Sequence, residues 1–255
     1  MKVVILAGGR GSRISEETHN KPKPIIAIGG KPILWHIMSH YSRYGFREFI
    51  ICLGYKGHVI KDYFARFHFH SSDVTINTGR PNDMQFHSSP ADPWIVTLVN
   101  TGDDTNTAGR IKRVSDYLDD KSFFLTYGDG VSNVNLDSLL KLHTETHADV
   151  TLTAVRAPGR YGAVSLAGDR VLSFEEKVEG YYSRINGGFF VVQPSILDLI
   201  TSDGQSWEYD ILPVVAQSHV LSAFNHDGFW QAMDTLRDKD YLDKLCESDV
   251  PPWLK

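Results

Sequence analysis

The chain has 255 residues, of which 42% are hydrophobic and 22% are charged, a composition typical of an ordinary globular protein. Its formal net charge of -5 at pH 7 argues against nucleic acid as a partner, because proteins that bind nucleic acid usually carry an excess of basic residues. The first apolar run, Val3 to Leu6, is too short for a signal peptide, and no segment approaches the ~18 to 20 apolar residues that span a bilayer. The two cysteines, Cys52 and Cys246, form no metal-binding motif. We therefore expect a cytoplasmic protein with no membrane partner.

Apolar runs alternate with helical patterns in the first half of the chain, which predicts an α/β fold. Strands are predicted at residues 3–6, 49–53, 94–99 and 123–126, helices at 31–44 and 111–118, and an irregular loop at 77–93. The first helix presents one apolar face, formed by Ile33, Leu34, Ile37, Met38 and Tyr41, and Gly45 marks its end. Because helices separate the strands, we expect a mostly parallel, Rossmann-like sheet that is covered on both faces.

The second half of the chain is richer in strands, which are predicted at residues 150–155, 163–166, 171–174 and 189–192. A closing helix is predicted at 234–246. We expect these strands to form a smaller, mixed β-rich lobe that lies against the first sheet. No Pro/Ser-rich linker and no repeat separates the halves, so residues 1–255 are interpreted as one domain, with halves at about 1–149 and 150–255.

A glycine-rich loop follows the first predicted strand directly, with glycines at positions 8, 9 and 11. Glycines at the end of a strand let the backbone turn sharply and bring its N–H groups against phosphate oxygens. The loop is not the dinucleotide fingerprint, because Ile14 stands where the third glycine would fall, and it lacks the Gly-Lys-Ser/Thr ending of a Walker loop. The glycines alone are equally compatible with a structural turn.

Cationic residues near this loop favour a phosphate site. Arg13 follows the glycines at once, and Lys23 lies between Pro22 and Pro24, which restrict its backbone and exclude a regular helix. A stiff loop that presents a lysine can neutralise a triphosphate without reorganising. Lys21 is equally compatible with a solvated loop.

In their order along the chain, these segments resemble the sugar-1-phosphate nucleotidyltransferases. The resemblance covers essentially the whole chain and rests on residues 6–13, 21–24, 54–57, 126–131, 185–190, 228–231 and 233–239. Within that superfamily, Ser15-Glu16-Glu17-Thr18 and the segment 30–38 are similar to the glucose-1-phosphate cytidylyltransferases. The resemblance implies a nucleotidyltransferase fold whose β-rich second half binds the sugar.

The resemblance also implies a reaction, in which a cytidylyl group passes from CTP to glucose 1-phosphate to give CDP-glucose and pyrophosphate. The sugar phosphate would attack the α-phosphorus in line and need no general base, because it is already anionic. Two aspartates that match Asp129 and Asp234 hold Mg²⁺ in this family. From the residues alone, Asp129 could instead be a turn residue and Asp234 a helix cap.

The other site residues follow from the same resemblance. Arg13 and Lys23 are expected to be catalytic. The residues expected to bind the nucleotide are Leu6, Ala7, Gly8, Gly9, Arg10, Gly11, Ser12, Arg13, Lys23, Thr105, Arg110 and Gly128. Those expected to bind the sugar phosphate are Tyr161, Gly162, Glu176, Lys177, Asn186 and Gly187.

Some residues depart from the family pattern. Arg10 replaces a usually apolar residue, Val178 and Ala232 replace prolines, and Ala108 replaces a glycine. A related transferase that uses another sugar 1-phosphate or another nucleoside triphosphate therefore remains an alternative. A non-catalytic sugar-nucleotide sensor is a third hypothesis, but retention of both cationic and both acidic site residues argues against it. The family further implies a homo-oligomer that acts in nucleotide-sugar and lipopolysaccharide O-antigen biosynthesis.

Overall fold

The computed structural model describes residues 1–80, 83–88, 93–156, 163–167, 170–175, 184–247 and 250–255. A seven-stranded sheet forms its centre, with the strand order β14-β10-β13-β8-β1-β4-β7. Its strands, in chain order, are β1 (Val3–Leu6), β4 (Glu48–Leu53), β7 (Ile95–Asn100), β8 (Phe123–Tyr127), β10 (Val150–Val155), β13 (Ile185–Val192) and β14 (Leu221–His226). β13 runs antiparallel to both of its neighbours, and the remaining pairs are parallel.

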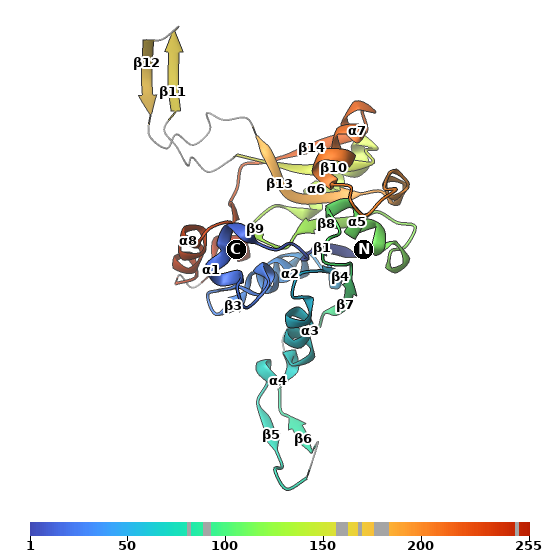
Figure 1. Cartoon of the computed structure of the whole chain (residues 1–255), viewed down its shortest axis with the longest axis vertical. Coiled ribbons are helices and arrows are strands. Elements are labelled where there is room, and N and C mark those ends of the chain that lie inside the picture. The colour runs from blue at the N-terminus through green and yellow to red at the C-terminus, as the bar shows by residue number, and fades with distance from the viewer. Residues whose placement is uncertain (81–82, 89–92, 157–162, 168–169, 176–183, 248–249) are drawn as a thin grey trace.

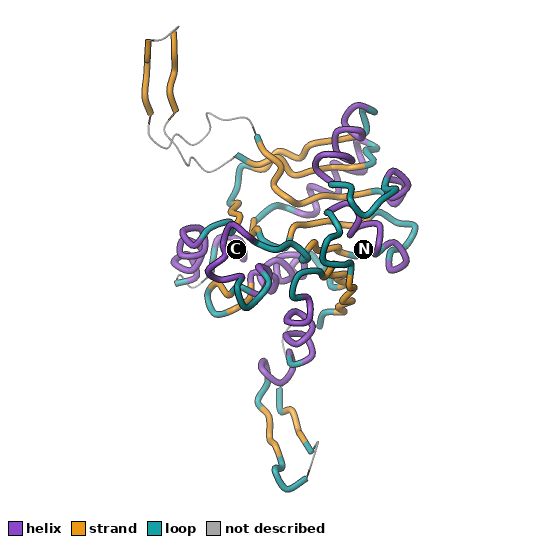
Figure 2. The backbone as a smooth tube through the Cα atoms, viewed as in Figure 1, coloured by secondary structure: helices purple, strands orange, loops and turns teal. Residues whose placement is uncertain are grey.

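Helices pack around this sheet, and short strand pairs lie outside it (Figure 1, Figure 2). The α-helices are α1 (Ser15–Thr18), α2 (Ile33–Arg43), α3 (Gly57–Ala65), α4 (Phe67–Ser71), α5 (Thr107–Arg113), α6 (Leu136–Thr146), α7 (Leu212–Gln217) and α8 (Leu236–Cys246). The two-stranded pairs are β2 (Ala27–Ile28) with β3 (Lys31–Pro32), β5 (Val74–Ile76) with β6 (Met84–Phe86), β9 (Gly130–Ser132) with β15 (Trp230–Ala232), and β11 (Ala163–Ala167) with β12 (Arg170–Glu175). None of the helices in the described part of the chain has the length and apolar content that crossing a bilayer requires.

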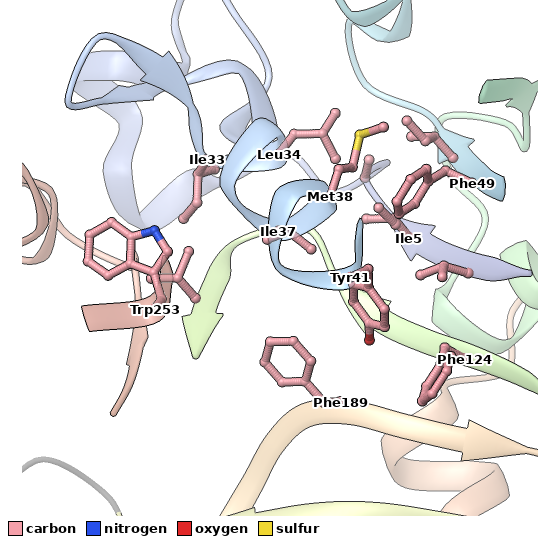
Figure 3. Packing of buried hydrophobic residues seen from close by; sticks show 14 of the residues in the cluster. Ile5, Ile33, Leu34, Ile37, Met38, Tyr41, Phe49, Phe124, Phe189 and Trp253 are labelled. Atoms are coloured by element: carbon pink, nitrogen blue, oxygen red, sulfur yellow. The ribbon is translucent and has the colours of Figure 1, made fainter. Parts of the chain in front are cut away.

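The apolar face predicted for residues 33–41 packs against the sheet as part of α2 (Figure 3). The centroid of the Tyr41 ring lies 5.4 Å from that of the Phe124 ring of β8 and 6.2 Å from that of the Phe189 ring of β13. The helix ends as expected, because Gly45 adopts a φ of 82°, which glycine tolerates best. This core holds β1, β8 and β13 in fixed positions beneath the glycine-rich loop.

The mostly parallel α/β sheet expected from the sequence is confirmed, and three local details differ from the expectation. The strands of the second half do not lie against the first sheet as a separate layer, because β10, β13 and β14 continue the same sheet. The helix expected at 111–118 is α5, which starts at Thr107 and is followed by a 3₁₀ turn at Ser115–Tyr117. The loop expected to be irregular contains β6, which pairs with the preceding β5 in a hairpin that extends away from the main sheet in Figure 1.

Candidate active site

The glycine-rich loop leaves β1 at the sheet edge where neighbouring parallel strands also end. Leu6 lies opposite Cys52 of β4 and Tyr127 of β8, so three strand ends meet at the start of the loop. Gly128 N–H donates to the Leu6 carbonyl at 3.0 Å. Open α/β sheets bind ligands at this edge, and the strand pairing therefore fixes the loop against it.

Arg110, on α5, lies directly beneath the loop and is buried. A Cβ added to Gly8 would lie 2.2 Å from its Nη1 atom, so a larger residue at that position would require the guanidinium or the loop to shift. The guanidinium donates hydrogen bonds to the Thr101 hydroxyl and to three backbone carbonyls, which are those of Leu53, Gly102 and Asp103. Burial lowers the pKa of Arg110 below its ordinary value. Arg110, one of the residues expected to bind the nucleotide, thus joins the end of β4 to the segment after β7 and packs against Gly8.

Lys23 lies in a 3₁₀ turn, Lys23–Ile25, and its side chain is only 9% exposed. Its ammonium group donates to Asp129 Oδ2 at 2.8 Å and to Asp234 Oδ1 at 2.8 Å. Burial lowers the pKa of Lys23, but the two carboxylates outweigh burial and hold the pKa above its ordinary value. The lysine therefore remains charged and links two acidic residues that are distant in the sequence.

The pairing of β9 with β15 explains why these two aspartates meet. Asp129 directly precedes β9, Asp234 follows β15, and the antiparallel register places Gly130 opposite Ala232. Backbone bonding extends past the ladder, because Met233 N–H donates to the Asp129 carbonyl at 2.8 Å. Both carboxylates therefore reach Lys23 from the same end of one strand pair.

The interpretation of Asp234 as a helix cap is wrong. The N-cap residue of α8 is Thr235, whose hydroxyl accepts from the Asp238 N–H, and the Asp238 side chain completes a capping box. The Asp234 carboxylate instead accepts from Lys23 and, at 3.1 Å, from Nη1 of the exposed Arg13 side chain. Arg13, Lys23 and both aspartates thus form one cluster, which we call the charged cluster.

A cavity of about 410 Å³ opens between the glycine loop and the charged cluster, a volume within the range of small-molecule sites. The predicted residues that line it are Leu6, Ala7, Gly8, Gly9, Gly11, Arg13, Lys23, Thr105, Arg110, Gly128 and Asp129. Arg10 lies in an adjoining hollow of about 370 Å³, where its side chain pairs with Asp104 at 2.9 Å. The backbone of Ser12 begins the 3₁₀ turn after the loop.

Two of the expected sugar-phosphate residues lie beside this cavity, at the start of β13. The Asn186 amide nitrogen donates to the Tyr127 hydroxyl at 3.1 Å, and Tyr127 lines the cavity. The Gly187 carbonyl accepts from the Trp230 indole N–H at 2.7 Å. The other four expected residues lie outside the described residues; they are Tyr161, Gly162, Glu176 and Lys177.

Sequence reasoning missed several residues that line the cavity, which are Pro24, Asn106, Thr107, Tyr127 and Glu208. Glu208 belongs to a π-helix, Trp207–Ile211, whose N-cap is Ser206. The serine followed by acidic residues could have indicated a helix start. No sequence pattern shows, however, that this turn faces the end of β8.

The geometry of the charged cluster fits a divalent cation. Both aspartate carboxylates already converge on one positive group, the Lys23 ammonium, so their oxygens lie within two hydrogen-bond lengths of each other. Oxygen ligands are those that Mg²⁺ prefers, and it completes its shell with phosphate and water. Among the described residues, no group of three or more His, Cys, Asp or Glu side chains gathers to bind a metal. Two carboxylates this close together could ligate such an ion, with the rest of its shell completed from other sources.

A glycine loop at the edge of a largely parallel sheet, with a charged cluster beside it, is an arrangement that can bind a phosphate-bearing ligand. Residues 2–244 match the model of the nucleotidyl transferase family, so the chain belongs to this family. A glucose-1-phosphate cytidylyltransferase of Salmonella typhimurium is 53% identical over 99% of this chain and 98% of that protein. This match confirms the expected resemblance to the cytidylyltransferases.

Two solved structures share the fold. HddC from Yersinia pseudotuberculosis, complexed with GMP-PN, has a TM-score of 0.70 and is 24% identical, covering 95% of this chain and 98% of that chain. The inositol-1-phosphate CTP transferase from T. maritima has a TM-score of 0.65 and is 16% identical, covering 98% of this chain and 97% of that chain. At these identities the likeness concerns the fold alone.

Proposed function

We propose that this chain transfers a cytidylyl group from CTP to glucose 1-phosphate, which gives CDP-glucose and pyrophosphate. The observation that carries the proposal is the charged cluster at one wall of a cavity that the glycine loop lines. Similarity to a glucose-1-phosphate cytidylyltransferase over 99% of the chain supports the choice of CTP and glucose.

Binding of CTP would place its phosphates between the glycine loop and the charged cluster. A phosphate oxygen of glucose 1-phosphate attacks the α-phosphorus of CTP, and a new P–O bond forms as the bond to the pyrophosphate oxygen breaks. Because the attacking oxygen is already anionic, the protein needs to supply alignment and positive charge. Lys23 is fixed by two ion pairs and Arg13 by one. Both cations can therefore stabilise the charge that develops on the phosphates without reorganising first.

We assign Mg²⁺ to Asp129 and Asp234, whose carboxylates converge on Lys23. The ion would supply positive charge at the phosphates that react and would orient them. Lys23 would remain beside the aspartates as a further cation in the cluster. The proposal requires that both carboxylates be charged, and substitution by asparagine tests this.

The experiment that tests the proposal measures pyrophosphate release over a grid of nucleoside triphosphates and sugar 1-phosphates. We expect CTP with glucose 1-phosphate to have the highest kcat/KM. A higher value with UTP or dTTP would overturn the choice of nucleotide. A higher value with CTP and another sugar would overturn only the choice of glucose, and the lack of any turnover would favour a sugar-nucleotide sensor.

We propose further that the chain acts in the cytoplasm as a homo-oligomer. Both cysteines are free thiols, and Cys52 is buried, which suits a reducing compartment. Family resemblance supports the oligomer and a role in supplying CDP-glucose to O-antigen synthesis. Light scattering during size-exclusion chromatography tests the oligomeric state, since a mass near 28.7 kDa would indicate a monomer.

A further inference from the structure

A chain of hydrogen bonds connects Glu208, on the nucleotide side of the cavity, with the start of β13. The Tyr127 hydroxyl donates to Glu208 Oε1 at 2.6 Å and accepts from the Asn186 amide nitrogen at 3.1 Å. Asn186 Oδ1 in turn accepts from Gly188 N–H at 2.8 Å. Four groups from three segments that are far apart in the sequence are thus joined in series.

Glu208 is also held firmly itself. Its Oε2 atom accepts from the Thr107 hydroxyl at 2.7 Å and from the Ser206 hydroxyl at 2.8 Å. Thr107 is the first residue of α5, and its hydroxyl accepts from the Trp207 N–H at 2.8 Å. The carboxylate is therefore fixed between α5 and the π-helix, with Oε1 directed at the end of β8.

The groups at the two ends of this series of hydrogen bonds determine which group donates at each step. A carboxylate can only accept hydrogen bonds, so the Tyr127 hydroxyl must donate to Glu208. With its proton used in this way, the hydroxyl oxygen accepts, and the nitrogen of Asn186 must face it. At the other end, Gly188 N–H can only donate, so it requires the Asn186 oxygen. An asparagine amide has two orientations of similar shape, and this arrangement permits one.

The packing of the Tyr127 ring agrees with this arrangement. A Cβ added to Gly188 would lie 2.5 Å from the Tyr127 ring, and Gly188 has a φ of 77°, so the glycine allows the ring to lie against the start of β13. The ring position therefore keeps the hydroxyl between the Glu208 carboxylate and the Asn186 amide.

We propose that Glu208 is a positioning residue for the sugar phosphate, which acts through Tyr127 to fix the orientation of the Asn186 amide. The inference rests on the proposed function, in which Asn186 contacts the sugar phosphate. In the fixed orientation, one N–H and one oxygen lone pair of the amide remain for a sugar hydroxyl, each at a defined position. A carboxylate on the nucleotide side thus sets the hydrogen-bonding pattern offered to the sugar.

The decisive variant is Tyr127→Phe, which removes the hydroxyl and keeps the ring. We expect the KM for glucose 1-phosphate to rise roughly three- to tenfold, which corresponds to the net contribution of one hydrogen bond. The dissociation constant of CTP, measured by titration calorimetry, should change by less than about twofold, because the phosphate-binding groups are untouched. Tyr209→Phe is the matched control, since Tyr209 belongs to the same π-helix as Glu208 and is 86% exposed.

Glu208→Gln is the second variant, because glutamine keeps the shape but can also donate. The Tyr127 hydroxyl can then accept instead of donate, which removes the constraint at the Tyr127 end and leaves only the Gly188 N–H to orient the amide. We expect an increase in the KM for glucose 1-phosphate similar to that of Tyr127→Phe. The double variant should be no worse than Tyr127→Phe alone, because without the hydroxyl the carboxylate has nothing to orient.

A purely structural role predicts other results. In that case the variants would lower the melting temperature and leave the KM values for CTP and glucose 1-phosphate unchanged, or they would weaken the binding of both substrates alike. Either outcome, or additive effects in the double variant, would overturn the inference. Failure of the proposed function is distinguishable, because wild-type protein would then make no CDP-glucose before any variant is compared.

Discussion

Replacing Lys23 by methionine removes the ammonium group between Asp129 and Asp234 and keeps most of the side chain's length. The two carboxylates are then left facing each other without the cation that they share. Removing one partner of a buried ion pair costs about 3–5 kcal/mol. The Asp129 side chain is 33% exposed, and water screens part of that cost, so we expect a loss of about 2 kcal/mol.

Two measurements follow for Lys23→Met. In a chain of this size, 1 kcal/mol shifts the melting temperature by about 2–4 °C, so calorimetry without magnesium should show a decrease of about 4–8 °C. Turnover, followed by pyrophosphate release, should fall about 10²- to 10³-fold, because a fixed charge at the phosphates is lost. Mg²⁺ bound by the two carboxylates would replace the missing charge. Added Mg²⁺ should therefore raise the melting temperature of the variant more than that of the wild type.

The control for this prediction lies two residues earlier in the same loop. Lys21 pairs with Glu17 at 3.1 Å, and its side chain is 35% exposed. Such pairs contribute about 0–1 kcal/mol, so Lys21→Met should change neither melting temperature nor turnover appreciably. If Lys23→Met had the melting temperature of the wild type and a turnover within a few-fold of the wild-type value, the role assigned to the charged cluster would be refuted.

Three further predictions concern other parts of the molecule. Asp234→Asn should lower turnover about 10²-fold and lower the melting temperature less than Lys23→Met does, because Lys23 keeps its pair with Asp129. Thr235→Ala should destabilise the protein by about 1 kcal/mol through the lost cap and keep its activity. Gly8→Ala should raise the dissociation constant of CTP about tenfold, because the added Cβ, 2.2 Å from Arg110 Nη1, must displace the loop or the guanidinium. Burial lowers the pKa of His40 to about 4, so the unfolded chain binds a proton first as the pH falls below about 6.5. Stability should then decrease with falling pH by about 1.4 kcal/mol per unit down to pH 4, and His40→Leu should lose this contribution.

Each of these has a control or an outcome that contradicts it. Asp234→Asn with normal turnover and normal dependence on magnesium would exclude the metal role of that residue. The control for Gly8→Ala is Gly79→Ala in the distal hairpin, where, among the described residues, an added Cβ meets only Asn77 Oδ1 at 3.4 Å and CTP binding should not change. For His40, urea titrations at several pH values give the free energy of unfolding. Equal pH dependence in the variant and the wild type would show that this histidine is not the group responsible.

The sequence determined the local features of this protein, because local features depend on residues that are close together in the chain. The apolar run Val3–Leu6 became the buried strand β1, and the spacing of apolar residues at 33–41 placed the buried face of α2 correctly. The glycine loop follows β1 as expected, and ten of the twelve residues expected to bind the nucleotide line one cavity. The motifs also identified the family, since their order extends over nearly the whole chain.

Only the tertiary structure decided which distant segments meet. The β9–β15 ladder brings Asp129 and Asp234 to one point, and neither three-residue strand has a pattern long enough to predict its partner. The sequence predicted that a stiff loop presents Lys23 at a phosphate site, but only the fold supplies the two carboxylates that allow it to be buried with its charge. Glu208 showed no recognisable motif and reaches the cavity only because the π-helix packs against α5. Strand pairing and charge burial depend on contacts across the fold, and a side chain's own neighbours in sequence cannot specify them.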